Sequence, residues 1–326
     1  MTLRIASVLL CVWLLAGVQP AAVAGEYPTK AVTIVSPYGA GGNADLAARS
    51  LAAVAGKYLG QKVLVVDKTG AGGVTGSSYV LGSHKDGYTL LLARVGSQAV
   101  RPAMDSTIPY KWNDFTIIGM VETNPYVCVV AADSPIKNFK DFTATVKKKP
   151  GSLTYASSSV MDASVVFPVT VFQNLGLSAD AAVKIPYQGA GKTVAAVMGH
   201  QVDFTCNGVS PYASGLKSGA LRALVVSTKE RIPEAPDAPT ADEVGMPNLG
   251  LVSGWSALYG PGGLPKDVVA KWTAVLAKVS KDKEWIDLVK KRGSVPTIMS
   301  PAETTKFVGS QVTVFRTLGK KLGVAK

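Results

Sequence analysis

Three glycines lie between a β-branched run and a helical pattern in the stretch SPYGAGGNADLAAR, Ser36–Arg49. The first backbone N–H groups of a helix lack intrahelical partners, and the helix dipole adds partial positive charge there. Glycines let a backbone approach a ligand closely and turn sharply. Gly39, Gly41 and Gly42 therefore fit a binding site for a carboxylate or a phosphate.

The polar residues after these glycines permit a simpler interpretation. Asn43 or Asp45 can cap the helix through its side chain, and a tight capped turn explains both residues without a ligand. The stretch also lacks the Gly-Lys-Ser/Thr that follows the glycines of a nucleotide P-loop. An anion site and a plain strand-to-helix turn both stay open, and a nucleotide site is not expected.

A second polar loop, Ser157–Ser159, precedes another apolar helical pattern. Its hydroxyls and backbone N–H groups can donate to an anion. A serine nucleophile needs a base, and no Gly-x-Ser-x-Gly or suggestively placed histidine occurs here. The catalytic alternative, a secreted hydrolase or decarboxylase, would use Ser158 with Asp162 or Lys192. A third loop, Thr69–Gly76, is also glycine-rich and either binds an anion or permits close packing.

These loops connect short β-rich runs with helical stretches, an alternation typical of βαβ units on largely parallel sheets. The sequence therefore predicts an α/β fold class. The predicted strands are Val32–Ser36, Val63–Asp67, Thr89–Ala93, Tyr126–Ala131, Leu153–Ala156, Val183–Pro186, Val202–Thr205 and Leu224–Ser227. The predicted helices are Ala44–Leu59, Val74–Ser83, Asn138–Lys148, Ala163–Leu175, Thr193–Met198, Pro211–Ser218, Lys266–Val279, Lys283–Arg292 and Pro301–Leu322.

The N-terminal residues have the pattern of a secretory signal peptide, which predicts cleavage after Ala24 rather than a retained anchor. Arg4 precedes an apolar run, Ile5–Val18, and Ala22–Ala24 is a small-x-small cleavage motif. Removal of residues 1–24 from 326 leaves 302, enough for two domains. No later segment approaches the ~20 apolar residues that span a bilayer. An exported, soluble protein is expected.

The net charge of the chain is compatible with most classes of partner, but the distribution of its basic residues disfavours nucleic acid. The chain has 34 Lys and Arg against 22 Asp and Glu, a net charge of +12, and loss of Arg4 leaves 12 − 1 = +11. Lysines are spread along the chain without a basic stripe that alternates with aromatics, so nucleic-acid binding is not expected. The charge favours solubility and mildly favours anionic ligands.

Cysteine and histidine usage predicts neither a metal nor a cofactor. No CxxC motif or Cys/His cluster occurs, and His84 and His200 both lie in turn-like contexts. Cys128 and Cys206 remain after cleavage of the signal peptide. They could pair in an exported protein, but sequence alone does not place them within bridging distance, so a disulfide stays open.

Six blocks of the sequence, in order, resemble one family. They are YPTKAVTIVSPYGAGGNADLAAR, VVDKTGAGGVTGSSYV, DGYTLLLA, IPYQGAGKTVAAVMGHQVDF, LRALVVSTKERIPEAPDAPTADEVGMP and GWSALYGPGGLPKDVV. They are similar to the extracytoplasmic solute-binding proteins of tripartite tricarboxylate transporters, the Bug family. The resemblance runs from about Tyr27 to near the C-terminus, which makes it far more specific than any single glycine motif.

The resemblance implies a periplasmic binding protein with a type II-like, Venus-flytrap fold. Two α/β lobes with mostly parallel sheets would be joined by crossing strands. Residues 25–124 with 236–326 would form one lobe and residues 125–235 the other, with hinges near Val121–Val127 and Val225–Thr240. The family implies no catalysis and one small ligand, a di-, tri- or aromatic carboxylate, held between the lobes of a monomer.

The family also implies a destination for the ligand. The closed, liganded protein would present a surface to a tripartite tricarboxylate-type membrane permease, which supplies the energy for transport. A purely sensory role, in which the liganded protein engages a membrane receptor such as a sensor kinase, uses the same binding chemistry and stays open.

In that family, two loops hold a carboxylate through backbone N–H groups and ordered water. They correspond to Pro37–Asp45 and Ala156–Asp162 in this chain. The family's Tyr-x-Gly-x-Gly segment begins at Tyr187. Its Gly-x-Val-Asp motif ends at Asp203, which is expected to support the site because a bare carboxylate would repel an anion. The expected ligand-binding residues are Tyr38, Gly39, Ala40, Gly41, Gly42, Asn43, Asp45, Arg94, Ser157, Ser158, Ser159, Asp162, Tyr187, Gln188 and Asp203.

Two departures from the family pattern bear on the ligand. The second loop has no glycine, and Val160 and Met161 could give it an apolar wall, which favours an aromatic or apolar-bodied acid. Arg94 stands where relatives tend to carry small hydroxyl residues. An arginine at the end of a strand can hold a carboxylate with two nitrogens. An ion pair at the surface or between the lobes explains Arg94 equally.

Overall fold

The computed structural model describes residues 27–322. The predicted signal peptide, residues 1–24, lies outside this range and stays a prediction. Among the described residues, none of the helices combines the length and the apolar character needed to cross a membrane.

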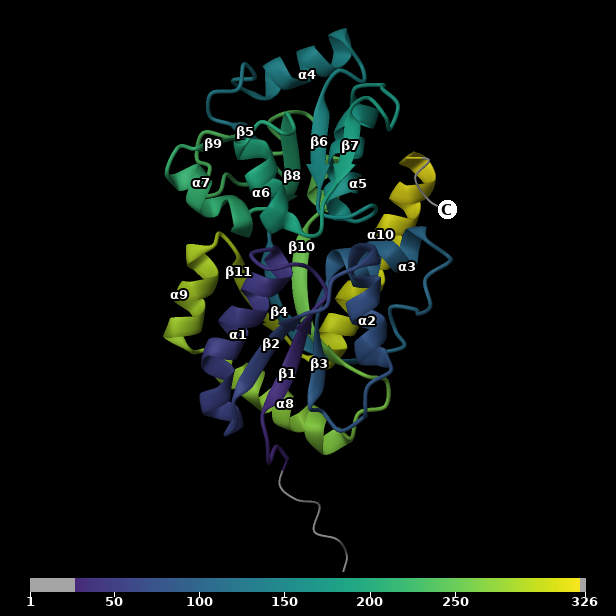
Figure 1. The fold of residues 1–326 in the computed structure, drawn as a ribbon, viewed down its shortest axis with the longest axis vertical. Helices are drawn as coiled ribbons and strands as arrows, with labels where there is room; N and C mark the ends of the chain where they lie inside the picture. Colours follow the sequence, from purple (N-terminus) through teal and green to yellow (C-terminus); the bar gives the residue numbers. More distant parts are fainter. Residues whose placement is uncertain (1–26, 323–326) are drawn as a thin grey trace, which may run out of the picture.

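Two separate sheets organise the chain, and each is covered by helices on both faces (Figure 1). The first has the order β11-β4-β10-β3-β1-β2, with bounds Val295–Met299, Thr116–Asn124, Gly254–Gly260, Thr89–Arg94, Val32–Ser36 and Val63–Asp67. The second has the order β7-β6-β8-β5-β9, with bounds Val183–Pro186, Thr154–Ser157, Phe204–Gly208, Tyr126–Ala131 and Leu221–Val226. We call each sheet with its helices the first lobe and the second lobe.

The predicted α/β class is confirmed, but the prediction of mostly parallel sheets is wrong. In the first sheet only β1 pairs in parallel, with β2 and β3, and β10 is antiparallel to both β3 and β4. In the second sheet β6 is parallel to β7 and β8, whereas β5 is antiparallel to β8 and β9. The mixture follows from the chain path, because β4 leads into the second lobe and β10 returns from it.

Successive side chains of a strand point to opposite faces of the first sheet, so their contacts show which helices cover which face. Leu90 and Leu92 of β3 share a core with α1, α8 and α9, whereas Leu91 and Ala93 point to the opposite face, where α2, α3 and α10 lie. These six helices span Asn43–Leu59, Lys266–Val279, Lys283–Lys291, Val74–Leu81, Arg101–Met104 and Pro301–Leu322.

The second lobe is built in the same way. Helices α4 and α5 cover one face of its sheet, and α6 and α7 cover the other, at Phe139–Lys148, Ala163–Asn174, Ala190–Met198 and Ala213–Lys217. Cys128 of β5 and Cys206 of β8 are direct cross-strand neighbours with Cα atoms 4.0 Å apart, and they form a buried disulfide. The sequence had left this pairing open.

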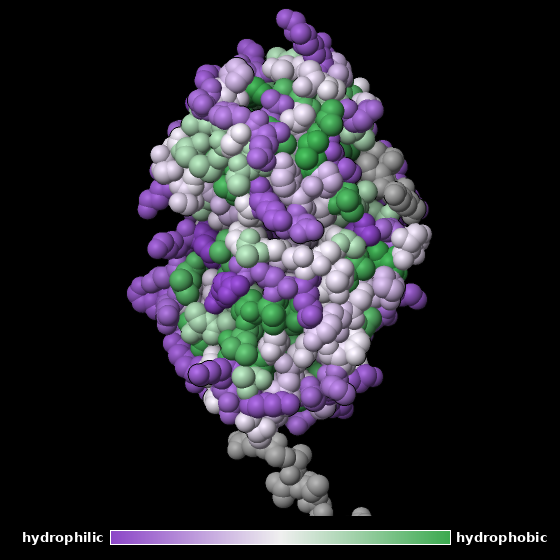
Figure 2. Space-filling model, in the orientation of Figure 1, coloured by the Kyte–Doolittle hydropathy of each residue, from purple (hydrophilic) through white to green (hydrophobic). Residues whose placement is uncertain are grey.

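The edge strand β2 carries exposed apolar side chains. Leu64 and Val66 are 50% and 44% exposed, and Figure 2 shows apolar surface over this part of the first lobe, surrounded by polar residues. Single exposed apolar residues are common on protein surfaces.

Two segments connect the lobes. The chain leaves the first sheet at Asn124 and enters the second at Tyr126, and it returns after Val226 through an irregular stretch to β10. On one side the lobes share a continuous apolar core, in which α5 approaches α10 (Figure 1). The carboxyl ends of β1, β3, β6 and β8 face the junction between the lobes, which is where open α/β sheets bind their ligands.

Candidate ligand-binding site between the two lobes

A small cavity lies where the two lobes meet, and we call it the central cavity. It measures about 20 Å³, close to the smallest space that can hold a water molecule. Its walls come from both lobes: Tyr38, Asn43, Ala44, Arg94, Val95 and Gly96 from the first, and Tyr126, Ser158, Asp162, Ala190 and Asn207 from the second.

Three helix N-termini converge on this cavity. Asn43 and Ala44 begin α1, Asp162 is the N-cap residue of α5, and Ala190 begins α6. The unpaired N–H groups and the dipole of each helix favour negative charge at its N-terminus. The predicted meeting of a loop from each lobe is therefore present, and a third helix from the second lobe joins it.

Arg94 brings a full positive charge to the same cavity. It ends β3 and is only 4% exposed. Its Nη1 donates to Oδ1 of Asn124 at 2.9 Å and to Oγ of Ser256 at 2.8 Å. Among residues 27–322, no ion pair includes Arg94. Burial lowers the pKa of Arg94, and the neighbouring Tyr126 and Glu122 oppose that shift, but arginine stays protonated in proteins.

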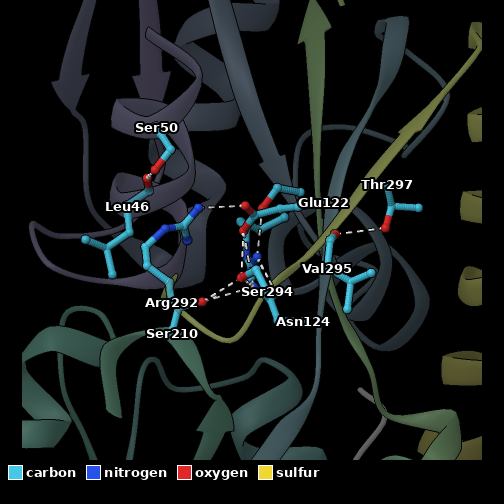
Figure 3. Close-up of polar contacts among 11 residues, drawn as sticks. Leu46, Ser50, Glu122, Asn124, Ser210, Arg292, Ser294, Val295 and Thr297 are labelled. Carbon is cyan, nitrogen blue, oxygen red and sulfur yellow. Dashed lines mark hydrogen bonds and ion pairs between the residues drawn. The ribbon is translucent and has the colours of Figure 1, made fainter. Parts of the chain in front are cut away.

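Asn124, which accepts from Arg94, belongs to a buried network with Glu122, Arg292 and Ser294, and Figure 3 shows these four residues. Nδ2 of Asn124 donates to Oγ of Ser294 at 2.8 Å and to Oε1 of Glu122 at 3.2 Å. Glu122 is fully buried, and its Oε2 accepts from Nη2 of Arg292 at 2.8 Å. Asn124 thus connects the two arginines. Glu122 makes its ion pair with Arg292, so Arg94 has a carboxylate in its neighbourhood but no ion pair of its own among the described residues.

The same network joins the lobes at their crossing. Oγ of Ser210, from the second lobe, lies 2.8 Å from Oγ of Ser294 in the first, and Asn124 reaches Ser210 at 3.3 Å. Figure 3 shows these side chains gathered at the junction of the two lobes. The orientation of Arg94 therefore depends on residues at the crossing between the lobes.

Two phenols complete the polar wall. Burial raises the pKa of Tyr38 and of Tyr126 well above their usual value, and the nearby Asp162 carboxylate raises both further. Both hydroxyls are therefore neutral. The hydroxyl of Tyr38 donates to the Gly72 carbonyl at 2.9 Å.

Asp162 acts mainly as a helix cap. Its Oδ1 accepts from the backbone N–H of Ser164 at 3.0 Å, and its Oδ2 accepts from Oγ of Ser158 at 2.5 Å. The side chain is held by these donors even though it borders the cavity. Ser157 is also used locally, because its Oγ donates to the Ser159 carbonyl at 2.7 Å.

A chain of hydrogen bonds crosses from one lobe to the other. Nδ2 of Asn43 lies 3.3 Å from Oδ1 of Asn207, whose Nδ2 donates to Oγ of Ser158 at 3.0 Å. Oδ1 of Asn43 is buried without a hydrogen-bond partner among the described residues. An acceptor without a donor costs free energy in a buried site, which marks this point as one where a donor is needed.

A larger space, the outer cavity, adjoins the central one and shares Tyr38 and Ser158 with it. It measures about 210 Å³. Besides Tyr38 and Ser158, its lining contains three more of the predicted residues, Ser159, Tyr187 and Gln188. The complete lining is Pro37, Tyr38, Thr69, Gly70, Ala71, Gly72, Gly73, Ser158, Ser159, Val160, Pro186, Tyr187, Gln188 and Gly189.

The glycines of the first loop, Gly39, Gly41 and Gly42, line neither cavity and lie against the second lobe. A Cβ atom on Gly39 would lie 2.5 Å from the Gln188 carbonyl oxygen, and one on Gly42 would lie 3.5 Å from the backbone nitrogen of Ala190. Ala40 is in the same contact, because a Cβ on Gly191 would lie 2.6 Å from its carbonyl oxygen. Glycines are needed here for close approach of two backbones.

Asp45 and Gly41 stabilise the loop from within. The carboxylate of Asp45 accepts from the N–H of Gly41 at 2.8 Å and pairs with Arg49 at 2.6 Å, one turn along α1. The prediction that Asn43 or Asp45 caps α1 is wrong, because Gly42 is the N-cap residue and no side chain of the described residues bonds there. Asp45 instead holds the loop that precedes the helix. Gly41 has a φ of +70°, a conformation that favours glycine.

Asp203 lies away from the site. It precedes β8, at the end of that strand opposite Asn207, and its Oδ2 accepts from the backbone N–H of Thr154 at 2.7 Å. Neither cavity includes it. Sequence reasoning did not single out Asn207 or Tyr126. Tyr126 begins the predicted strand Tyr126–Ala131, but Asn207 lies beyond the end of the predicted strand Val202–Thr205, which the structure extends to Gly208.

The alternatives to ligand binding have little geometry in their favour. Of the bases proposed for Ser158, Asp162 contacts it, but Lys192 is exposed and borders neither cavity. Within residues 27–322, no group of three or more His, Cys, Asp or Glu side chains is arranged for a metal ion.

The chain is similar to known proteins over most of its length. A profile of the family described as "Tripartite tricarboxylate transporter family receptor" matches residues 47–324. The UPF0065 protein in the TAR-I ttuE-ttuC' intergenic region of Agrobacterium vitis is 33% identical over 85% of this chain and 79% of its own length.

Two solved structures are similar in both fold and sequence. The periplasmic binding protein BugD is 31% identical, with a TM-score of 0.86 over 92% of this chain and 100% of its own. MatC from Rhodopseudomonas palustris, solved with bound malate, is 25% identical, with a TM-score of 0.84 over 90% of this chain and 100% of its own.

Proposed function

The chain belongs to the family of tripartite tricarboxylate transporter receptors, and on that premise we propose that it binds one small organic carboxylate between its two lobes and delivers it to a membrane permease. It is a periplasmic solute-binding protein of the Bug type, and BugD, one of the solved structures similar to it, is a periplasmic binding protein.

The observation that carries the proposal is the charge of Arg94. A buried cation is costly unless an anion compensates it. Arg94 faces the central cavity without an ion-pair partner among the described residues, while Asn124 and Ser256 occupy only one of its terminal nitrogens. A carboxylate can accept two parallel hydrogen bonds from one guanidinium. The ligand's carboxylate would supply the missing negative charge.

Neutral donors around Arg94 suit the same group. The first N–H groups of α1 and α6 and the hydroxyl of Tyr126 border the cavity, and each can donate to a carboxylate oxygen. In a water-poor site each of these bonds is stronger than in solvent. Asp162 does not oppose an anion strongly, because its oxygens already accept from Ser158 and Ser164.

Contacts between the lobes support closure around the ligand. The loop with Gly39 touches Gln188, and Asn43 bonds Asn207, so residues from both lobes surround the cavity only while these contacts hold. We take this arrangement as the closed form. A ligand that completes the site favours the closed form by its differential affinity for it.

The comparison with MatC supports the ligand class. That protein was solved with malate, a small carboxylate. Delivery to a permease of the tripartite tricarboxylate type, and a periplasmic location after signal-peptide cleavage, are the further parts of the proposal that follow from the family.

Isothermal titration calorimetry with purified protein, residues 25–326, tests the proposal with malate and benzoate as probes. At least one of them is expected to bind with one site per chain, and Arg94→Ala is expected to weaken its binding by more than ten-fold. Arg316→Ala, which removes an exposed arginine of α10, serves as the control. Equal affinities of wild type and Arg94→Ala would contradict the assigned site.

A further inference from the structure

We propose that the ligand is a monocarboxylic acid with an uncharged, largely apolar body about the size of one aromatic ring, whose carboxylate contacts Arg94 and whose body occupies the outer cavity. This inference rests on the proposed function and narrows its ligand class. It depends on how charge is distributed over the two cavities.

The central cavity provides for one negative charge. Arg94 is its one cation, and Asp162 is its one anion. One ligand carboxylate compensates the charge of Arg94, and a second carboxylate in this cavity would have no cation to compensate it. The cavity is also small, about 20 Å³, so it can take the oxygen end of one carboxylate but not the rest of an acid.

The outer cavity has no charged side chain that could compensate a charge on the ligand. None of the residues that line it is acidic or basic. Its walls are glycine backbone, the rings of Tyr38 and Tyr187, and the side chains of Pro186 and Val160, with hydroxyls and one amide between them. Ligand pockets of this kind hold apolar bodies and orient them with a few polar groups.

The size of the outer cavity sets the size of the body. Its volume is about 210 Å³, and an engineered apolar cavity of about 150 Å³ binds benzene. One six-membered ring, or a chain of similar volume, therefore fits. Tyr38 and Ser158 border both cavities, so the two spaces adjoin, and the proposal places the carboxylate of one acid in the central cavity and its body in the outer one.

A second carboxylate at the far end of such an acid would lack a cation in the lining. Lys184 contacts this lining from outside, because its Nζ donates to the backbone carbonyl of Val160 at 2.9 Å in an exposed position. Val160 itself is 50% exposed and marks the outer rim. Transfer of an anionic carboxylate into the uncharged part of the cavity costs free energy that an apolar terminus avoids.

Matched pairs of acids test the inference. Benzoate and terephthalate share one body, as do hexanoate and adipate, and the members of each pair differ in one carboxylate. By isothermal titration calorimetry, the monoacid of at least one pair is expected to bind at least ten-fold more tightly than its diacid. Tighter or equal binding of the diacid in both pairs would overturn the inference while leaving the proposed function intact. Absence of binding by all four acids and by malate would overturn both.

Two variants that each add one lysine test whether the uncharged lining of the outer cavity causes the preference for the monoacid. Val160→Lys adds a cation at the outer cavity and is expected to reduce the preference for the monoacid by at least five-fold. Val183→Lys adds the same charge on β7, where Val183 is 46% exposed and borders neither cavity, and it is expected to leave the preference unchanged. Equal effects of both variants would show that long-range charge sets the preference, which would overturn the inference. A diacid preference in wild type that Lys184→Met abolishes would overturn it as well.

Discussion

Nδ2 of Asn43 lies 3.3 Å from Oδ1 of Asn207, although 164 positions separate them in the sequence. Asn43 begins α1 of the first lobe, and Asn207 lies near the end of β8 of the second. Their contact bridges the two lobes beside the central cavity. It links the start of a helix in one lobe to Ser158 in the other, since Asn207 also donates to that hydroxyl.

Replacement of Asn43 tests the contribution of this bridge to binding. Asn43→Ala removes the bond between the lobes and keeps a good helix former at the start of α1. One hydrogen bond contributes about 1 kcal/mol, so affinity for the bound acid is expected to fall about five-fold, with little change in Tm without ligand. Thr297→Ala, which removes a bond to Thr123 inside the first lobe, is the control. Unchanged affinity in Asn43→Ala would show that the bridge does not support closure.

Replacement of Gly39 by a larger residue tests whether the two lobes must approach closely at this point for the ligand to bind. The φ of Gly39 does not lie in the left-handed region, so alanine fits the backbone, but the added Cβ would lie 2.5 Å from the Gln188 carbonyl oxygen of the other lobe. Gly39→Ala is expected to hold the lobes apart, to weaken binding at least ten-fold and to raise the radius of gyration of the liganded protein in small-angle X-ray scattering.

Gly82→Ala is the matched control for that experiment. A Cβ there would lie 3.6 Å from the nearest atom, the Ser78 carbonyl oxygen, which is an ordinary contact. Binding and scattering should match the wild type. If Gly39→Ala also closes fully around the ligand, the contact with Gln188 is not part of the closed form.

The disulfide is expected to stabilise the second lobe. Cys128 and Cys206 are 78 positions apart, and removal of a native disulfide costs about 2–5 kcal/mol in small exported domains. The double replacement of both cysteines by alanine should lower the free energy of unfolding in urea by a similar amount. The single site of acid binding should persist below the new Tm. A loss under about 0.5 kcal/mol would contradict a stabilising role.

Acid stability depends in part on Asp282, the N-cap residue of α9. Its carboxylate accepts from Tyr58 at 2.6 Å and pairs with Lys57 on α1. The hydrogen bond with Lys57, followed by that with Tyr58, lowers the pKa of Asp282 from 3.8 to about 2. Because the folded pKa lies below the unfolded one, the stabilisation is complete above pH ~4 and disappears as the pH falls toward 2.

Asp282→Asn tests this dependence while it keeps a capping side chain for Trp285. Urea unfolding should show the variant less stable than wild type at pH 7, with the difference shrinking between pH 4 and pH 2. Asp287→Asn, in an exposed pair with Lys283, should show little difference at any pH. A wild-type advantage over Asp282→Asn that persists at pH 2 would contradict the assigned cause.

The local parts of the fold could be predicted from the sequence. β1, β2, β5 and β7 lie where the β-branched runs predict them, and α8 and α10 match their predicted bounds. The strands β4, β10 and β11 were not predicted. β10, GWSALYG, has a glycine at each end and no period-two alternation because both of its faces are buried. β4 contains Gly119 and the fully buried Glu122, which interrupt a strand pattern.

The candidate site likewise contains some residues that local sequence patterns predict and others that they do not. Residues next to the glycine and serine loops, such as Asn43 and Ser158, were within reach of local reasoning. Asn207 and Tyr126 were not, because their place beside Arg94 depends on how the two lobes meet, which is a long-range property of the chain. The sequence also left open whether an acidic partner holds Arg94, and only the three-dimensional arrangement supplies Asn124 and Ser256 as its neutral partners.

The proposed function depends on a carboxylate that lies against Arg94 between the two lobes. A crystal structure of residues 25–326 with the acid that binds most tightly in calorimetry would locate this carboxylate. We expect a carboxylate oxygen within hydrogen-bond distance of the Arg94 guanidinium, near the first turn of α1, with the body of the acid beside Tyr187 and Val160. A carboxylate held elsewhere, with Arg94 bound only to Asn124 and Ser256, would contradict this proposal.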